Sequence, residues 1–139
     1  MKIYIGSDHA GYVFKKQLLN MYTCEDCGCF SNNSVDYPDI AKIVCTKINH
    51  DIDNNVKSIG ILICGTGIGM SIAANKYDNI RCALVYNNEC ASLTRKHNDA
   101  NVLALGARMT TFDNIKSIID IFINTEFEGG RHQNRINKL

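Results

Sequence analysis

The sequence predicts an α/β fold: an open, mostly five-stranded parallel sheet with helices on both faces, in a Rossmann-like three-layer sandwich. Two observations carry this prediction. Short apolar runs rich in branched residues alternate along the chain with longer segments of helical period, which is typical of βαβ units. The strongest runs are apolar almost throughout rather than at every second position, which indicates strands that are covered on both faces.

The first half of the chain supplies two strands and two helices. Lys2–Gly6 is an apolar run typical of a strand, and residues 8–22 follow with apolar side chains at helical spacing. A short second strand is expected within residues 24–30. Because proline suits the first turn of a helix, Tyr37 and Pro38 predict the start of the next helix.

The second half supplies three strands and three more helices. The strands are expected at 59–64, 80–86 and 101–105, and the helices at about 89–96, 111–124 and 128–138. Thr110 and Asp113 are the expected cap of the last long helix. No linker or repeat interrupts this pattern. Residues 1–139 are therefore expected to form one domain, with the C-terminal helix contributing to its site.

The composition is typical of a globular protein and excludes several classes. Hydrophobic residues make up 45% and charged residues 21% of the 139 residues. The formal net charge of +1 argues against a nucleic-acid-binding protein, which needs a basic excess. Residues 58–75 carry no charge, but the glycines within this stretch predict a strand, a loop and a helix rather than a membrane span.

The cysteines indicate a compartment. There are seven, an odd number, and the first residues lack the pattern of a secretory signal. We therefore expect free thiols in a reducing, cytoplasmic setting. Cys24, Cys27 and Cys29 have a spacing that suggests zinc or a redox pair, but no fourth ligand stands at a zinc-like distance. Metal binding by these thiols is therefore not expected.

A glycine-rich loop is expected after the strand at 59–64. From Cys64 it reads Cys-Gly-Thr-Gly-Ile-Gly, with glycine at every second position. Met70 stands where a dinucleotide fingerprint needs its third glycine, and the lysine of a P-loop is missing. Backbone amides exposed at the start of a helix favour negative charge. The loop therefore predicts an anion hole for a phosphate or for an oxyanion formed during a reaction.

Cys64 stands at the mouth of this loop and has two interpretations. A helix N-terminus can lower the pKa of a thiol into the physiological range, which would make Cys64 a reactive thiolate. Most free cysteines are instead small buried apolar residues. The position favours the reactive thiolate at least as strongly.

Further charged residues stand near predicted strand ends. Asp8 and His9 follow the first strand. Asp8 alone is typical of a helix cap, whereas the pair, at the carboxyl end of a parallel strand, favours a polar ligand site. Arg108 follows the last strand, and Arg131 and Arg135 share one face of the C-terminal helix. Each arginine is either a solvated surface residue or part of a phosphate clamp.

His97 is expected in a polar loop with Asn98, at the amino end of the last strand. Cys64 lies at the carboxyl end of its own parallel strand, and therefore at the opposite edge of the sheet. A catalytic His97 would then have to act in the site of a neighbouring subunit.

Five segments together resemble the type B ribose-5-phosphate isomerase family, which also contains the galactose-6-phosphate isomerase subunits. They occur in family order at residues 6–11, 34–41, 64–76, 95–108 and 127–135. The resemblance implies an aldose–ketose isomerase that interconverts ribose 5-phosphate and ribulose 5-phosphate through an enediolate. It implies no metal and no organic cofactor, a place in the pentose phosphate pathway, and a homodimer or a dimer of dimers with shared sites.

The resemblance also implies roles for individual residues. Cys64 matches the base that moves a proton between C1 and C2, and Thr66 matches a hydroxyl that moves protons between the two oxygens. His97, assisted by Asp8, matches the group that opens the furanose ring. The implied substrate contacts are the loop residues Gly65, Thr66, Gly67, Ile68 and Gly69, the phosphate ligands His9, Arg108, Arg131 and Arg135, the sugar ligand Asn98, and Tyr37 along the pocket.

Alternatives remain open at this point. One branch of the family uses a glutamate just after the glycine loop as its base; here Met70 stands there, so the chain resembles the cysteine-dependent branch. An isomerase for allose 6-phosphate or galactose 6-phosphate is one rival, although the intact Asp8–His9 pair favours ribose phosphate. A non-catalytic sugar-phosphate-binding module is another, and it would not need Cys64, Thr66 and His97 together.

Overall fold

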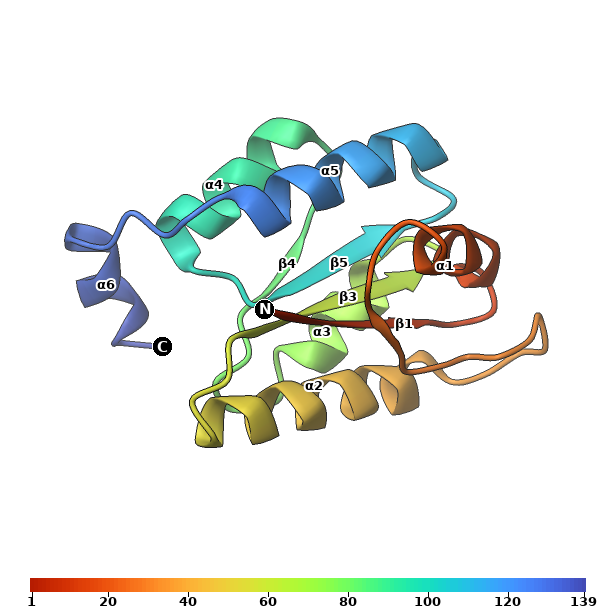
Figure 1. The fold of residues 1–139 in the computed structure, drawn as a ribbon, viewed down its shortest axis with the longest axis horizontal. Helices are drawn as coiled ribbons and strands as arrows, with labels where there is room; N and C mark the ends of the chain where they lie inside the picture. Colours follow the sequence, from red (N-terminus) through yellow and green to blue (C-terminus); the bar gives the residue numbers. More distant parts are fainter.

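The computed structural model describes all residues 1–139 and contains one five-stranded parallel sheet (Figure 1). Its strands are β1 (Lys2–Ser7), β2 (Glu25–Asp26), β3 (Ser58–Cys64), β4 (Cys82–Leu84) and β5 (Val102–Gly106). Their order across the sheet is β2-β1-β3-β5-β4, and every neighbouring pair is parallel. The predicted fold class is confirmed.

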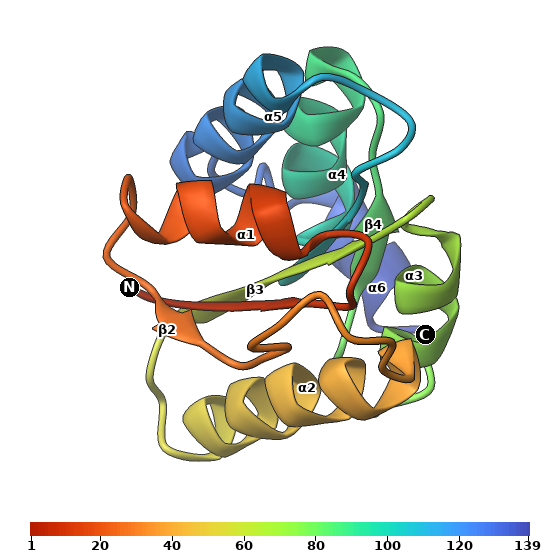
Figure 2. The same ribbon diagram turned by 90° about the vertical axis from the view of Figure 1, so that its right-hand side faces the viewer.

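Helices cover both faces of the sheet. They are α1 (Tyr12–Leu19), α2 (Tyr37–Asp53), α3 (Ile68–Ala74), α4 (Asn88–Asn98), α5 (Phe112–Asn124) and α6 (Arg131–Ile136). Figure 2 shows α1, α4 and α5 on one face and α2 and α3 on the other. The short α6 lies apart, beyond the amino ends of the strands (Figure 1). No helix is both long enough and apolar enough to cross a membrane.

Two apolar clusters hold the helices to the sheet, one on each face. Leu62 of β3 points to the face of α2 and α3 and lies in one cluster with Val44 and Met70. Its neighbour Ile61 points to the other face and lies in a cluster with Ile118 of α5. Because successive strand residues alternate between faces and both faces are buried, β3 is apolar throughout, as its sequence predicted.

The second strand is shorter than the predicted segment 24–30. Only Glu25–Asp26 forms a regular strand, although the Cys27 and Cys29 amides still donate to carbonyls of the first strand. Between these two cysteines, Gly28 has a φ of +100°. This conformation departs from extended backbone and interrupts the regular ladder.

Several helix boundaries also differ from the sequence prediction. The segment 8–22 is helical only over Tyr12–Leu19, and the segment 128–138 only over Arg131–Ile136. Thr111 rather than Thr110 caps α5, since its Oγ1 accepts a hydrogen bond from the Asn114 amide at 3.3 Å. The predicted cap is therefore wrong by one residue. His97 and Asn98 form the last turn of α4 instead of a loop. The helix ends only at Asp99, which has a positive φ of 42°.

A buried carboxylate joins the end of α2 to β1. Asp51 is 1% exposed and accepts hydrogen bonds of 2.8 Å from Lys2 Nζ and from the Tyr4 hydroxyl. The hydrogen bond from Lys2 above all, with that from Tyr4, holds the pKa of Asp51 below its usual value, although burial opposes this. The sequence reading did not single out this contact.

Candidate active site

The glycine loop follows β3 at the carboxyl edge of the sheet, and its path requires glycine at position 67. Gly67 has a φ of +80°. A Cβ at this position would lie 2.6 Å from Cδ1 of Leu84 and 2.9 Å from the carbonyl carbon of Leu105. Neither the backbone conformation nor the space therefore admits a side chain. The sequence signal, glycine at alternate positions, reflects this close approach to β4 and β5.

Cys64 lies at the start of the loop with its sulfur against a backbone amide. The Gly67 amide donates a hydrogen bond to Cys64 Sγ at 3.0 Å. Cys64 is only 4% exposed and also packs in the apolar cluster beside α2 and α3. The residue therefore combines both interpretations of its sequence position: it is buried, and its sulfur faces an amide that favours a negative charge.

The loop also presents amides with no partner inside the chain. The N–H groups of Gly65, Thr66, Gly69 and Met70 donate to no protein acceptor. Backbone donors of this kind, grouped around a turn at the start of a helix, stabilise an anion. These amides are therefore free to donate to a bound anion, as the predicted anion hole would require.

Tyr86 holds the middle of the loop, and sequence reasoning did not identify it. Its hydroxyl donates to the Thr66 carbonyl at 2.9 Å, while its own carbonyl accepts from Asn114 Nδ2 at 3.2 Å. Thr66 Oγ1 accepts from the Ile68 amide at 3.2 Å and lies at the surface. The only available signal was the position of Tyr86 at the end of a predicted strand.

Asp8 and His9 lie at the same edge, after β1. Asp8 Oδ1 accepts from the amides of Ala10 and Gly11 at 2.9 and 3.2 Å and so closes the turn before α1. It does not cap the helix as Asp8 alone would predict, because α1 begins only at Tyr12 and has no side-chain cap. Its own amide donates to the Ile63 carbonyl and so fastens this turn to the end of β3. His9 Nδ1 accepts a hydrogen bond of 3.4 Å from the amide of Val35, which lies two residues before α2.

Arg108 and Tyr37 flank the glycine loop. A Cβ at Gly65 would lie 3.4 Å from Nη1 of Arg108, so the guanidinium lies against that glycine. A Cβ at Gly69 would lie 2.7 Å from the ring of Tyr37. One edge of the sheet therefore unites a thiol, free amides, an arginine and a tyrosine, together with the turn that carries Asp8.

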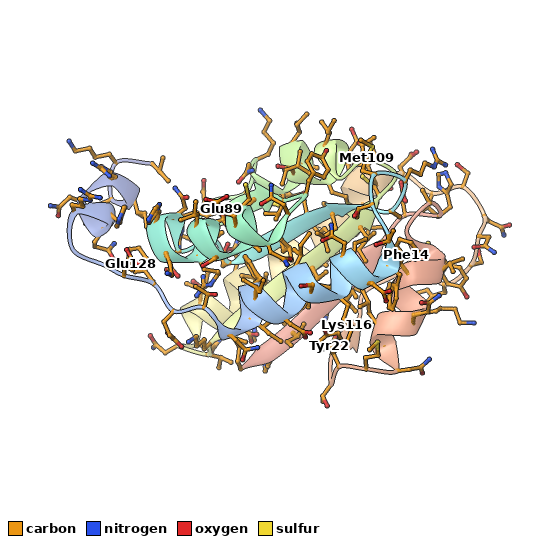
Figure 3. All side chains as sticks on the ribbon, turned by 90° about the horizontal axis from the view of Figure 1, so that it is seen from above. Phe14, Tyr22, Glu89, Met109, Lys116 and Glu128 are labelled. Carbon is orange, nitrogen blue, oxygen red and sulfur yellow. The ribbon has the colours of Figure 1, made fainter.

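The remaining predicted residues lie at the opposite edge. They are His97, Asn98, Arg131 and Arg135, carried by the end of α4 and by α6. In the register of the sheet, Cys64 lies opposite Gly106 while His97 precedes the start of β5. The length of β5 alone separates the two edges by about 13 Å. In Figure 3, Met109, which follows Arg108, and Glu128, which precedes α6, lie at opposite ends of the molecule.

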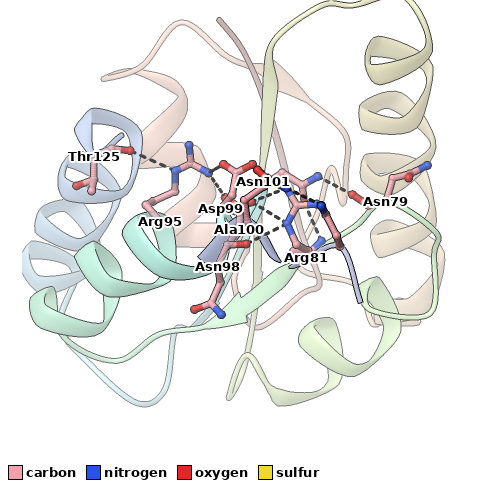
Figure 4. A network of polar contacts seen from close by, with 10 residues as sticks. Asn79, Arg81, Arg95, Asn98, Asp99, Ala100, Asn101 and Thr125 are labelled. Atoms are coloured by element: carbon pink, nitrogen blue, oxygen red, sulfur yellow. Dashed lines mark hydrogen bonds and ion pairs between the residues drawn. The ribbon is translucent and has the colours of Figure 1, made fainter. Parts of the chain in front are cut away.

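A polar network fixes the turn that follows His97 and Asn98 (Figure 4). Arg81 Nε donates to the carbonyls of Asn98 and Asp99 at 3.0 Å, and its Nη2 reaches Asp99 Oδ2 at 2.9 Å. From the other side, Arg95 Nη1 donates to Asp99 Oδ1 at 2.9 Å. The two guanidinium groups therefore hold Asp99 between them and fix the end of α4.

His97 packs against residues that were not predicted as site residues. Its ring stacks on that of His132 with centroids 4.3 Å apart and an interplanar angle of 11°. Nε2 of each ring lies 3.9 Å from Oε2 of Glu128. Burial, and next the charges of His97, Arg131 and Arg135, lower the pKa of His132. The sequence places Glu128 and His132 in a segment that resembles the family, but only the fold brings them to His97.

A cavity of about 970 Å³ opens beside this second group, between the β4 edge and α6. Arg81, Asn98 and Gln133 contribute to its lining, whereas Cys64 does not. The single chain therefore carries the two groups of predicted site residues at opposite edges of the sheet, and this cavity lies with only one of them.

Comparison with known proteins connects this arrangement to a family. The family model described as Ribose/Galactose Isomerase matches residues 3–139. Ribose-5-phosphate isomerase B of Escherichia coli is 38% identical to this chain. The alignment covers 99% of this chain and 93% of the Escherichia coli protein. A Thermotoga maritima ribose 5-phosphate isomerase structure is 46% identical, with a TM-score of 0.91 over 99% of this chain and 95% of that one.

A further similar structure has been solved with a bound ligand. It is ribose-5-phosphate isomerase B of Mycoplasma genitalium with bound ribulose-5-phosphate, 41% identical, with a TM-score of 0.89 over 99% of this chain and 92% of that chain. The match of nearly every residue to the family model, joined to the same fold at this level of identity, means that the chain belongs to the ribose/galactose isomerase family.

Proposed function

We propose that this chain is a ribose-5-phosphate isomerase that interconverts ribose 5-phosphate and ribulose 5-phosphate. The observation that carries the proposal is the Cys64 sulfur, which accepts from the Gly67 amide at 3.0 Å in a loop whose other amides include four without an acceptor. Removing a proton next to a carbonyl requires a base and donors for the oxyanion that forms. The loop supplies both. The relatives named ribose-5-phosphate isomerase support this substrate.

Cys64 acts as the base on the open-chain sugar. Its thiolate takes the proton from C2, and the electron pair of that bond forms the C1–C2 double bond while O1 becomes an oxyanion. The free amides of Gly65 and Thr66 receive this charge. The Thr66 hydroxyl moves a proton between O2 and O1, and the Cys64 thiol returns its proton to C1.

A second copy of the chain completes the site. The ring-opening group, His97, and the phosphate ligands Arg131 and Arg135 lie at the edge opposite Cys64 within one chain. We infer a homodimer, or a dimer of dimers, in which His97 of the partner subunit acts beside Asp8. Arg108 and His9 bind the phosphate from the Cys64 side.

An exposed apolar surface supports this assembly. Ile68 and Ile72 of α3 are 47% and 57% exposed, and Met109, beyond β5, is 55% exposed. These side chains stand beside the Cys64 loop, where a second copy must dock for its His97 to enter the site. Burying them contributes favourable free energy to association.

The setting follows from the same chemistry. A cysteine base works only while its sulfur is reduced and not oxidised, so we propose a reducing, cytoplasmic location. The proposed substrate places the reaction in the pentose phosphate pathway. All seven cysteines are free in the structure.

The deciding experiment measures ribulose 5-phosphate formed from ribose 5-phosphate by the purified protein in the presence of EDTA. Allose 6-phosphate and galactose 6-phosphate serve as competing substrates at equal concentration. A higher kcat/KM for the five-carbon substrate supports the proposal. A higher value for a six-carbon substrate assigns the rival activity, and no turnover of any of the three contradicts an isomerase.

A further inference from the structure

Three side chains converge on one point, and one of them is His97, the proposed ring-opening group. His97 from α4, His132 from α6 and Glu128 from the segment before α6 offer ligand atoms that all lie within 4.8 Å of one another. Each histidine Nε2 is 3.9 Å from the same carboxylate oxygen, Glu128 Oε2. Segments distant in sequence therefore form a compact group of two imidazoles and one carboxylate.

None of these three side chains forms a hydrogen bond in the structure. The 3.9 Å separations are too long for one. The side chain of His132 is only 9% exposed, whereas that of Glu128 is 49% exposed. The His132 ring and the accessible Glu128 carboxylate therefore have no hydrogen bond that a ligand would need to displace.

The donor set and the spacing fit Zn²⁺. Zinc takes imidazole nitrogen at about 2.0–2.1 Å and carboxylate oxygen at about 2.0–2.2 Å, so tetrahedral ligand atoms stand about 3.4 Å apart. The two nitrogen–oxygen distances of 3.9 Å need a contraction of about half an ångström to reach this value. The ligand atoms of the two histidines, which lie within 4.8 Å of each other, must also move together. The nearly parallel rings must also tilt toward one another. Mg²⁺ and Ca²⁺ prefer all-oxygen sites and are disfavoured here.

We propose that His97, Glu128 and His132 form a reversible binding site for one Zn²⁺ per chain, with a fourth position open to water. The surrounding cations limit its affinity. Lys96 Nζ already lies 3.8 Å from Glu128 Oε1, and Arg131 and Arg135 flank His132 along α6. Bound metal would repel these charges, so the site is a regulatory one rather than the tight site of a resident cofactor.

The consequence for activity rests on the proposed function. Zinc bound to Nε2 of His97 occupies the lone pair with which that imidazole would accept or relay a proton during ring opening. The ion therefore inhibits isomerisation, and chelation restores it. No step of the isomerase reaction itself uses the metal.

Direct binding tests the site independently of catalysis. Zn²⁺ is titrated into chelator-treated protein, in a buffer without phosphate, by calorimetry and by competition with a chromogenic chelator. Because free thiols also bind zinc, the readout is the difference between variants. Glu128→Gln and His132→Asn are each expected to bind one Zn²⁺ fewer per chain than the original protein, or to bind it with an affinity at least about tenfold lower.

Matched controls exclude a general loss of surface charge. Glu126→Gln removes an exposed carboxylate two residues away, and His50→Asn removes an exposed histidine that neighbours Asp51. Both are expected to bind as many Zn²⁺ as the original protein, and Mg²⁺ is expected to bind to none of the variants. Equal zinc stoichiometry and affinity in Glu128→Gln, His132→Asn and the original protein would overturn the site.

The activity measurement separates the two proposals. Zn²⁺ is expected to lower turnover of ribose 5-phosphate by the original protein, and EDTA to restore it, whereas Glu128→Gln keeps its turnover in zinc. Loss of binding in the variants without any zinc inhibition of the original protein would retain the site and refute the role of His97 in catalysis. Zinc inhibition that persists in Glu128→Gln would overturn the regulatory role.

Discussion

Cys64 is the residue on which the proposed chemistry depends. Its sulfur is buried, receives an amide hydrogen bond and lies beside unpaired backbone donors. Burial alone would disfavour a thiolate, whereas amide donors stabilise it. The local structure of the loop therefore turns an ordinary core position into a candidate base.

Replacing the Cys64 sulfur should stop proton transfer without preventing substrate binding. Cys64→Ala is expected to lower kcat by at least about 10²- to 10⁴-fold, the range for a lost acid–base group, while substrate still binds. Activity is measured by ribulose 5-phosphate formation and binding by calorimetry. Cys90→Ala, which changes an exposed thiol, is the control. Near-normal turnover in Cys64→Ala would remove this residue as the base.

Tyr86 acts on the site through the backbone of Thr66. Tyr86→Phe removes a single hydrogen bond, worth about 0.5–1.5 kcal/mol, and frees the loop peptide to rotate. We expect kcat to fall by about two- to tenfold with KM nearly unchanged, because the Tyr86 hydroxyl binds the Thr66 carbonyl and no proposed phosphate ligand. Tyr77→Phe, whose hydroxyl forms no hydrogen bond in the structure, is the control. A KM effect alone would contradict a positioning role.

At the scale of elements, the loop and the sheet depend on one another. Gly67→Ala introduces a side chain both at a positive φ and against β5. Gly129→Ala introduces one only at a positive φ of +67°, because no atom lies within 4 Å of the added Cβ. The difference in unfolding free energy between the two variants therefore measures the clash, and we expect Gly67→Ala to be the less stable by about 1–3 kcal/mol. Equal destabilisation of the two variants in chemical denaturation would show that the loop moves to accommodate the added methyl group, and would contradict the prediction.

The contact between α2 and β1 predicts a pH dependence of stability. The pKa of Asp51 is lower in the folded protein than in the unfolded chain, because Lys2 and Tyr4 bind the carboxylate. Its contribution is therefore complete above the unfolded pKa and is lost as pH falls through the folded pKa. Denaturation at a series of pH values should show a smaller acid-side slope in Asp51→Asn than in the original protein. Asp53→Asn is the matched control, and an unchanged slope in Asp51→Asn would contradict the linkage.

At the scale of the whole molecule, Cys64 and His97 lie at opposite edges of the sheet in one chain. This predicts that two inactive variants can restore activity to each other in a mixed dimer. Cys64→Ala and His97→Ala are each expected to be inactive as homodimers. Subunits mixed after denaturation and refolded together should recover about a quarter of normal activity, because half the dimers are hybrids and each hybrid has one intact site. Turnover per milligram is the measurement, with each variant refolded alone as control. No recovery would place both residues in a site within one chain.

Most of the fold follows from local patterns in the sequence. The continuous apolar run at 59–64 predicts a central strand, and Pro38 predicts the start of α2; both are confirmed. Such features depend on neighbouring residues alone. Boundaries were less predictable: His97 and Asn98 belong to α4 because Arg81 and Arg95 hold the turn after them, and this contact joins distant segments.

The candidate site divides in the same way. The chemistry of Cys64, the glycine loop and the arginines was visible in the sequence, because residue type and spacing are local properties. Tertiary structure alone decided that Tyr86 holds Thr66 and that Glu128 and His132 meet His97. The position of His97 at the edge opposite Cys64 was already predicted from the order of the elements, and the register of the sheet agrees with it. The physical reason is that side-chain contacts between remote segments arise from packing and strand register, which no short stretch of chain encodes by itself.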